Sequence, residues 1–126
     1  MKMVLMVALG GAIGSSARYL IGVLATRLFG IGFPWGTMIV NIVGSFAMGI
    51  LIALLALKYS VSNEMRGFLA IGVLGGFTTF SSFALDVVYL YEKKQYLASA
   101  GYMSVSVICS ILALFSGLAL ARAMAV

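Results

Sequence analysis

The sequence has few charged residues and no histidine. Only 9% of its 126 residues are charged, and just three are acidic: Glu64, Asp86 and Glu92. Metal centres need clusters of His, Cys, Asp or Glu, while glycosidase sites need paired carboxylates and hydrolytic triads usually need a histidine. We therefore expect neither an enzyme nor a metal site built from side chains.

Cysteine is equally scarce, and the basic residues are scattered. Cys109 is the single cysteine, so no disulfide can form within the chain. The net charge is +5, but the Lys and Arg residues do not gather into the patch or stripe that nucleic-acid binding needs. A few of them flank apolar runs, where they suit lipid headgroups. We expect the lipid bilayer as a partner and no nucleic acid.

Apolar residues make up 63% of the sequence, far more than in a soluble domain. Four apolar stretches, roughly 3–29, 36–57, 65–91 and 97–121, each reach the ~20 residues that a helix needs to cross a bilayer. The first could pass for a secretory signal peptide, but its apolar run resumes at Tyr19 and continues to Phe29. The sequence thus predicts an all-α membrane protein, with residues 1–126 forming a single domain of four transmembrane helices.

The basic residues give no preferred orientation in the membrane. With four spans, one side carries Lys2, Lys58, Arg66 and Arg122, and the other carries Arg27, Lys93, Lys94 and, if it reaches the surface, Arg18. Orientation normally follows an excess of Lys and Arg on the cytoplasmic side. Either a cellular factor fixes one orientation, or the chain inserts both ways and pairs with an inverted copy of itself.

Uncharged polar residues recur at helical spacing inside two of the spans. Asn41 shares a face with Ser45 and Gly49, where it could bond to another helix or donate to a passing anion. Tyr102, Ser106 and Ser110 recur every four residues, so their hydroxyls can form a polar track along one side of the last span. Leu114 ends that track.

Arg18 lies several turns inside the first span. Its long side chain could reach the interface, hold a fixed positive charge in a vestibule, or tie two helices together.

The segment GGFTTFSSF, residues 75–83, is a poor helix former inside the third span. A break within a membrane is tolerated where the freed backbone groups line a cavity or meet an ion or another chain. Its carbonyl groups would suit a cation, and the N–H groups of a new helix start would suit an anion. Phe80 and Phe83 share a face, and the positive edges of their rings could contact a dehydrated anion, although packing between helices is the common role of such pairs.

Along nearly its whole length the chain resembles the Fluc (CrcB) family of fluoride channels. The matching stretches are GGAIGSSARY at 10–19, GTMIVNIVGSF at 36–46, and GGFTTFSSF at 75–83 with Asp86 after it. The resemblance implies an antiparallel, dual-topology homodimer in the bacterial inner membrane. Two pores would let fluoride leave the cytoplasm passively and so lower its toxicity.

The resemblance also assigns roles to individual residues. It implies a sodium ion held as a structural element at the dimer interface by the backbone carbonyls of Gly75 and Thr78. The residues that it places along the fluoride pore are Asn41, Thr79, Phe80, Ser81, Phe83, Tyr102, Ser106 and Ser110. The chain departs from the family pattern where Ser82 replaces Thr, Ala84 replaces Ser and Asp86 replaces Glu, which bears on conduction rate and gating.

Two other functions fit the composition. A small four-helix, dual-topology exporter of cationic drugs would have the same length and charge balance, but it needs a carboxylate in its first span, where this chain has Arg18. A structural membrane subunit would use the polar residues only to join helices. The residues alone do not separate a channel from a proton-coupled exchanger.

Overall fold

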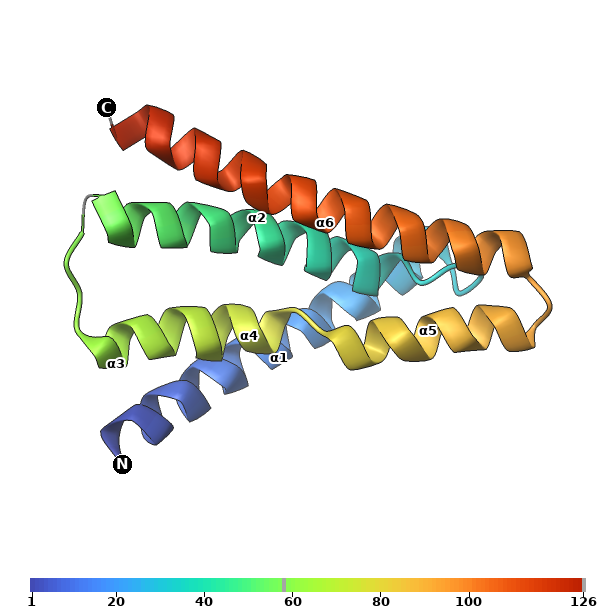
Figure 1. Ribbon diagram of the computed structural model, residues 1–126. Coiled ribbons are helices and arrows are strands. Elements are labelled where there is room, and N and C mark those ends of the chain that lie inside the picture. Colours follow the sequence, from blue (N-terminus) through green and yellow to red (C-terminus); the bar gives the residue numbers. More distant parts are fainter. Residues whose placement is uncertain (58, 126) are drawn as a thin grey trace.

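The computed structural model describes residues 1–57 and 59–125, which form a bundle of long helices (Figure 1). The elements are α1 (Lys2–Phe29), α2 (Trp35–Leu57), α3 (Asn63–Arg66), the π-helical η1 (Gly67–Leu74), α4 (Gly75–Phe77), α5 (Phe80–Glu92) and α6 (Tyr96–Ala125). The elements from α3 to α5 follow one another along a single line, which we call the third rod (Figure 1). Together with α1, α2 and α6 it gives four long helical segments.

Within the described residues, four helical stretches are long and apolar enough to cross a membrane: Lys2–Phe29, Trp35–Leu57, Asn63–Glu92 and Tyr96–Ala125. The four predicted spans are therefore confirmed, with ends that differ by only a few residues. Large apolar side chains such as Leu5, Leu24 and Phe115 lie exposed on the outside of the bundle. These apolar side chains are suited to contact with lipid. The helical backbone is suited to it as well, because its polar groups pair within each helix and need no water. The chain is a multi-pass, all-helical membrane protein.

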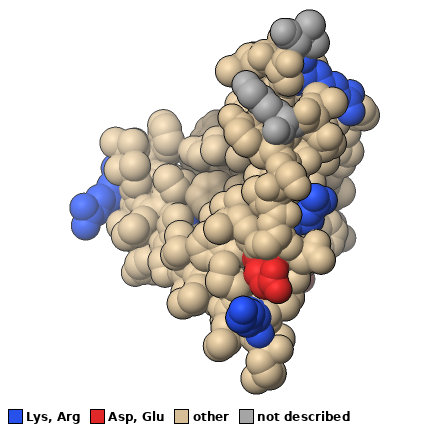
Figure 2. Space-filling view, turned by 90° about the vertical axis from the view of Figure 1, so that its left-hand side faces the viewer, with Lys and Arg blue, Asp and Glu red and all other residues tan. Residues whose placement is uncertain are grey.

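The helices alternate in direction, which brings both termini to one end. Both α1 and the third rod run away from that end, and α2 and α6 return to it side by side (Figure 1). Figure 2 looks onto this end, where Lys and Arg side chains form separate spots, with an acidic spot among them, on an otherwise uncharged surface. The basic residues on this face are thus dispersed.

Glycine allows two pairs of helices to approach closely. A Cβ atom at Gly49 of α2 would overlap the backbone of Leu114 in α6, and one at Gly117 would overlap the backbone of Phe46. Likewise, Gly10 and Gly14 of α1 face backbone atoms of η1 that leave no room for a side chain. Small residues at helix contacts are typical of membrane proteins, where close van der Waals packing drives association. The tightest contacts therefore join α2 to α6 and α1 to η1.

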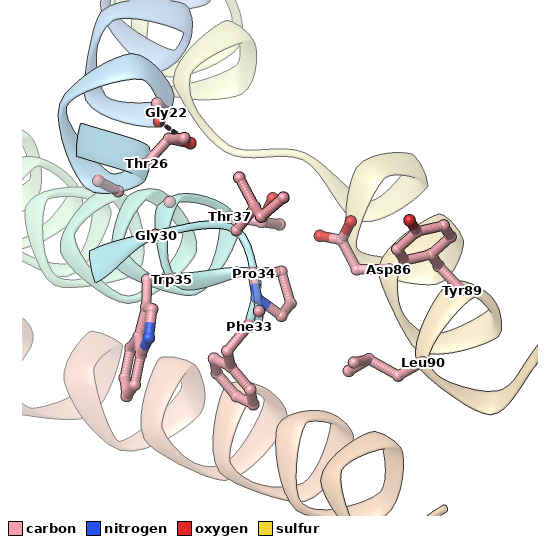
Figure 3. A pocket seen from close by; sticks show the side chains of 14 residues that line it. Gly22, Thr26, Gly30, Phe33, Pro34, Trp35, Thr37, Asp86, Tyr89 and Leu90 are labelled. Atoms are coloured by element: carbon pink, nitrogen blue, oxygen red, sulfur yellow. Dashed lines mark hydrogen bonds between the residues drawn. The ribbon is translucent and has the colours of Figure 1, made fainter. Parts of the chain in front are cut away.

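The first connection turns sharply at Gly30. Its φ of 80° lies in the left-handed region that favours glycine, and its N–H donates to Thr26 O at the end of α1. The chain then passes Pro34 and enters α2. This connection forms one wall of a cavity of about 270 Å³, whose other walls are the last turns of α1 and part of α5 (Figure 3).

The third rod is interrupted at two threonines. Gly75 keeps helical backbone angles (φ −64°, ψ −37°), whereas Thr78 (φ −88°, ψ 160°) and Thr79 (φ −155°, ψ 120°) are extended. The interruption thus lies just after the glycine pair and not at it. Gly76 packs against the backbone of Gly11 in α1, so the second glycine of the pair also serves close packing between helices.

Candidate functional site

Asn41 of α2 reaches across to the interrupted segment. Its Nδ2 donates to Thr79 O at 3.0 Å, and its Oδ1 accepts from Thr79 N–H at 2.8 Å. One side chain thereby satisfies both backbone groups of a residue outside any helix, which would otherwise remain unpaired in an apolar environment. The interhelical bond considered for Asn41 is present, and one amide hydrogen remains for another acceptor.

These bonds change the pairing of the neighbouring carbonyl groups. In a continuous helix Thr79 N–H would donate to Gly75 O, four residues earlier, but here it donates to Asn41. The next carbonyl, Gly76 O, accepts from Arg18 Nε at 3.0 Å. Arg18 thus ties α1 to α4, which is one of the roles considered for it. The interruption leaves Gly75 O without its helical donor and Gly76 O bound to a guanidinium.

The helix after the interruption begins with a side-chain cap. Thr79 Oγ1 accepts from Ser82 N–H at 3.2 Å, and it lies 3.4 Å from Ser81 Oγ. Thr is a favoured residue at this position because its oxygen satisfies one of the free N–H groups of the first turn. The N–H groups of Phe80 and Ser81 come before that of Ser82 and cannot pair with carbonyl groups within α5. The positive end of the α5 dipole therefore lies at this point.

A cavity of about 260 Å³ lies beside the interruption, between α2, α5 and α6. We call it the central cavity. The residues that line it are Asn41, Ser45, Thr78, Thr79, Phe80, Phe83, Ser106, Val107, Ser110 and Ile111.

Two phenylalanine rings form one wall of the central cavity. The ring centroids of Phe80 and Phe83 are 5.6 Å apart, and the ring planes are inclined at 51°. Phe83 is buried, with 7% of its surface exposed, whereas Phe80 is 78% exposed. The rings therefore present edges as well as faces, and the exposed Phe80 is available to a further surface.

Two serine hydroxyls face the central cavity without a partner. Ser106 Oγ and Ser110 Oγ are buried, and neither has a hydrogen-bond partner within the described part of the chain. Serines in membrane helices often bond back to the preceding turn, as Ser116 Oγ does to Leu112 O at 2.8 Å. A buried hydroxyl without a partner costs about 1–3 kcal/mol, so these two are placed for a ligand or water.

Tyr102 belongs to a different set of contacts. Its hydroxyl donates to Asp86 Oδ2 at 3.0 Å. The centroid of its ring lies 5.4 Å from the ring centroid of Phe83 and 5.5 Å from that of Phe33. Tyr102 is completely buried and does not line the central cavity. The predicted track of three hydroxyls is therefore divided: two face the cavity and the third holds a carboxylate.

The structure brings most of the other predicted pore residues together. Asn41, Thr79, Phe80, Phe83, Ser106 and Ser110 all line the central cavity, and Ser81 lies exposed beside Thr79. Sequence reasoning did not include Ser45, Val107 and Ile111. Ser45 lies one helical turn after Asn41 on the face that the sequence predicts for both, but the predicted pore residues did not include it. Val107 and Ile111 each follow a serine of the hydroxyl track, and nothing in the sequence indicates that they line the cavity.

The fold and this cavity define a class: a multi-pass helical membrane protein in which an apolar cavity with a few polar side chains lies at an interrupted helix. A family model for "CrcB-like protein, Camphor Resistance (CrcB)" matches residues 5–118. The chain belongs to this family.

Similar proteins cover almost the full chain. One, from Agrobacterium fabrum, is 58% identical over 117 residues, which span 93% of this chain and 94% of the relative. Another, from Chelativorans sp., is 57% identical over 118 residues and 94% of each chain. A third, from Rhodospirillum centenum, is 52% identical over 122 residues and 97% of each chain. All three are named "Fluoride-specific ion channel FluC".

Proposed function

We propose that this protein is a passive, selective fluoride channel that lets fluoride leave the cytoplasm and so lowers its toxicity. The observation that carries the proposal is the central cavity, in which two buried serine hydroxyls lack partners beside the start of α5. The relatives named as fluoride-specific channels, which match over more than nine tenths of this chain, support the choice of anion.

Hydrogen-bond donors in the central cavity can replace the water around a small anion. Ser106 and Ser110 each offer an O–H group, and Asn41 retains one N–H beyond its bond to Thr79. The N–H groups at the start of α5 add a positive partial charge nearby. Thr79 and Ser81 extend this polar line toward the exposed surface. Donors in a site with few competing waters favour the most strongly hydrogen-bonding halide.

Phe80 and Phe83 supply a second kind of contact. Ring edges carry the positive end of the aromatic quadrupole, so an anion that has shed water can lie against them. A wall of ring edges holds an anion weakly, and weak binding at successive sites is what conduction requires.

A sodium ion fits the interrupted segment as a structural element. Gly75 O has lost its helical donor to Asn41, and Thr78, in extended backbone, directs its carbonyl away from helical pairing. Carbonyl oxygens of these two residues, from two copies of the chain, would hold the ion, which supplies a fixed positive charge between the copies. Arg18 already binds Gly76 O, which leaves that carbonyl out of the ion's shell.

An antiparallel homodimer is the assembly we propose, with two pores and with both orientations in the bacterial inner membrane. The even distribution of Lys and Arg supports dual topology. Phe80 lies exposed beside the central cavity, where a partner copy would cover it. Within such a dimer the third helix would be interrupted at membrane depth.

The two competing functions are less well supported. A proton-coupled cation exporter needs a carboxylate in the first span, where Arg18 instead binds a carbonyl group. In a structural subunit, the buried hydroxyls of Ser106 and Ser110, which have no partner among the described residues, would lower stability without serving a function.

A flux measurement tests the proposal. Purified protein is reconstituted in liposomes loaded with fluoride or chloride, and release is followed with ion-selective electrodes. A channel releases fluoride only after a potassium ionophore allows compensating charge movement, and it retains chloride. Release of neither ion from folded protein would favour a structural subunit, and proton-driven release without the ionophore would indicate an exchanger.

A further inference from the structure

Ser45 of α2 lines the central cavity, and its hydroxyl has no hydrogen bond to another residue in the described part of the chain. Other hydroxyls in the spans pair with their own helix: Ser15 Oγ donates to Gly11 O, and Thr26 Oγ1 donates to Gly22 O. Such a bond to the preceding turn is the ordinary use of a hydroxyl in an apolar helix. Ser45 instead keeps its O–H group for a group inside the cavity.

The packing of α2 against α6 decides which side chain lies across from Ser45. A Cβ atom at Gly49 would overlap the backbone of Leu114, so the two helices touch at this level. Both helices run in the same direction (Figure 1). One turn back from the contact therefore brings Ser45 of α2 to about the level of Ser110 of α6. The end of the cavity away from the interruption thus has one hydroxyl from each helix.

The end of the cavity at the interruption has a similar pair of donors. The Asn41 amide binds Thr79 there and keeps one N–H, and Ser106 Oγ has no partner among the described residues. Asn41 precedes Ser45 by four residues, as Ser106 precedes Ser110, so the two pairs are about 6 Å apart along the helices. Successive sites at short distance are what conduction of an ion requires.

The rest of the lining offers little to an anion at the Ser45 level. Thr78 Oγ1 donates to the preceding turn, and Thr79 Oγ1 accepts from the first turn of α5. The side chains of Val107 and Ile111 have no hydrogen-bonding group. Without Ser45, the hydroxyl from α6 would be the single donor at this end of the cavity.

We propose that Ser45 and Ser110 form a second fluoride position, one helical turn from the position at Asn41 and Ser106, and that Ser45 sets its affinity for the ion. This inference rests on the proposed function. Two hydroxyls on facing helices can contact a small anion from opposite sides. Hydrogen bonds to an ionised acceptor are shorter and stronger than those to a neutral one, so the two donors offset part of the water that fluoride has lost.

The test is fluoride release from liposomes over a range of fluoride concentrations, with Ser45→Ala and Ser45→Thr beside the wild-type chain. Loss of a hydrogen bond to a charged group should raise the half-saturating fluoride concentration of Ser45→Ala by about tenfold. Ser45→Thr keeps a hydroxyl on Cβ, so its half-saturating concentration should stay within about threefold of wild type. Ser116→Ala is the matched control, because the Ser116 hydroxyl donates to its own helix.

Thermal unfolding in detergent separates this effect from packing. Since Ser45 Oγ has no partner within the described residues, Ser45→Ala should unfold at the wild-type temperature. An unchanged half-saturating concentration in Ser45→Ala, or an equal rise in Ser45→Ala and Ser45→Thr, would overturn the second position and leave the proposed function intact. Absence of fluoride release from the folded wild-type chain would overturn both.

Discussion

The side-chain amide of Asn41 in α2 holds both the N–H and the C=O of Thr79, at 2.8 and 3.0 Å. An interrupted helix exposes backbone groups that lipid cannot satisfy. Here one residue satisfies two of them and at the same time fixes the start of α5 against α2. The shape of the central cavity therefore depends on a single amide.

Replacing Asn41 tests that dependence. Asn41→Ala removes two hydrogen bonds worth roughly 1 kcal/mol each, so we expect a loss of about 2 kcal/mol in unfolding free energy. Asn41→Asp retains the acceptor for Thr79 N–H but loses the donor, and should fall below the wild-type chain in both stability and fluoride release. Thermal unfolding in detergent measures the first effect. Asn63→Ala, on exposed α3, is the control; unchanged stability in Asn41→Ala would contradict the interpretation.

Removal of either aromatic ring should slow fluoride release. Phe80→Leu and Phe83→Leu keep an apolar side chain but remove the ring edge. If each edge lowers the barrier by about 1.4 kcal/mol, release slows about tenfold. The liposome assay measures this, with Phe29→Leu as control because Phe29 lines neither cavity. Wild-type rates in both variants would remove the ring edges from the mechanism.

Replacement of Ser106 or Ser110 by alanine is expected to affect stability and fluoride release in opposite ways. An alanine at either position removes a buried hydroxyl without a partner, so the folded protein should be as stable as the wild-type chain or more stable. Fluoride release should nevertheless fall, since a donor to the anion is lost. Ser116→Ala, whose wild-type hydroxyl binds its own helix, should change neither quantity. A stability loss with unchanged release would indicate that the serines serve packing alone.

Dual topology predicts that the C-terminus is found on both sides of the membrane. A cysteine added at the C-terminus of a Cys109→Ser variant can be labelled with an impermeant reagent in intact cells. We expect about half of the chains to react, since the Lys and Arg residues give no bias. Labelling of all or none of the chains would rule out insertion both ways.

The proposed sodium ion predicts a dependence on sodium. Because backbone carbonyls from two copies would share the ion, its removal should loosen the dimer and stop fluoride release. Purification and reconstitution in sodium-free buffer, with potassium or N-methylglucamine as replacement, provide the comparison. Full activity and an intact dimer in protein from which bound sodium is shown to be absent would exclude a structural sodium ion.

The sequence predicts the fold well because the bilayer imposes simple rules. Each span is visible as an apolar run of sufficient length, and Lys, Arg, Gly and Pro mark the ends. The π-helical turns of η1 carry no such signal. They arise where Gly67 and Gly72 let the helix pack against α1, a tertiary effect that no local pattern reports.

The sequence predicts which residues form the site, but it does not predict which of them bind one another. Spacing places Ser106 and Ser110 on one face with Tyr102, yet the length of the tyrosine side chain carries its hydroxyl away from theirs to Asp86. In the same way, the glycine pair indicates where a helix can open, but the extended residues are the two threonines that follow. The Asn41 amide, which both donates to Thr79 O and accepts from Thr79 N–H, lies 38 residues earlier in the chain, a relationship that periodicity within one helix does not contain.

The bond from Arg18 to Gly76 has a consequence for biosynthesis. A guanidinium near the middle of a span raises the free energy of insertion by roughly 2.5–3.5 kcal/mol when that helix enters the bilayer alone. The carbonyl that receives it lies 58 residues further along and has not yet been synthesised when α1 leaves the ribosome. We therefore expect the first helix to be weakly anchored until the third rod arrives, so that both of the proposed orientations remain open to it during translation.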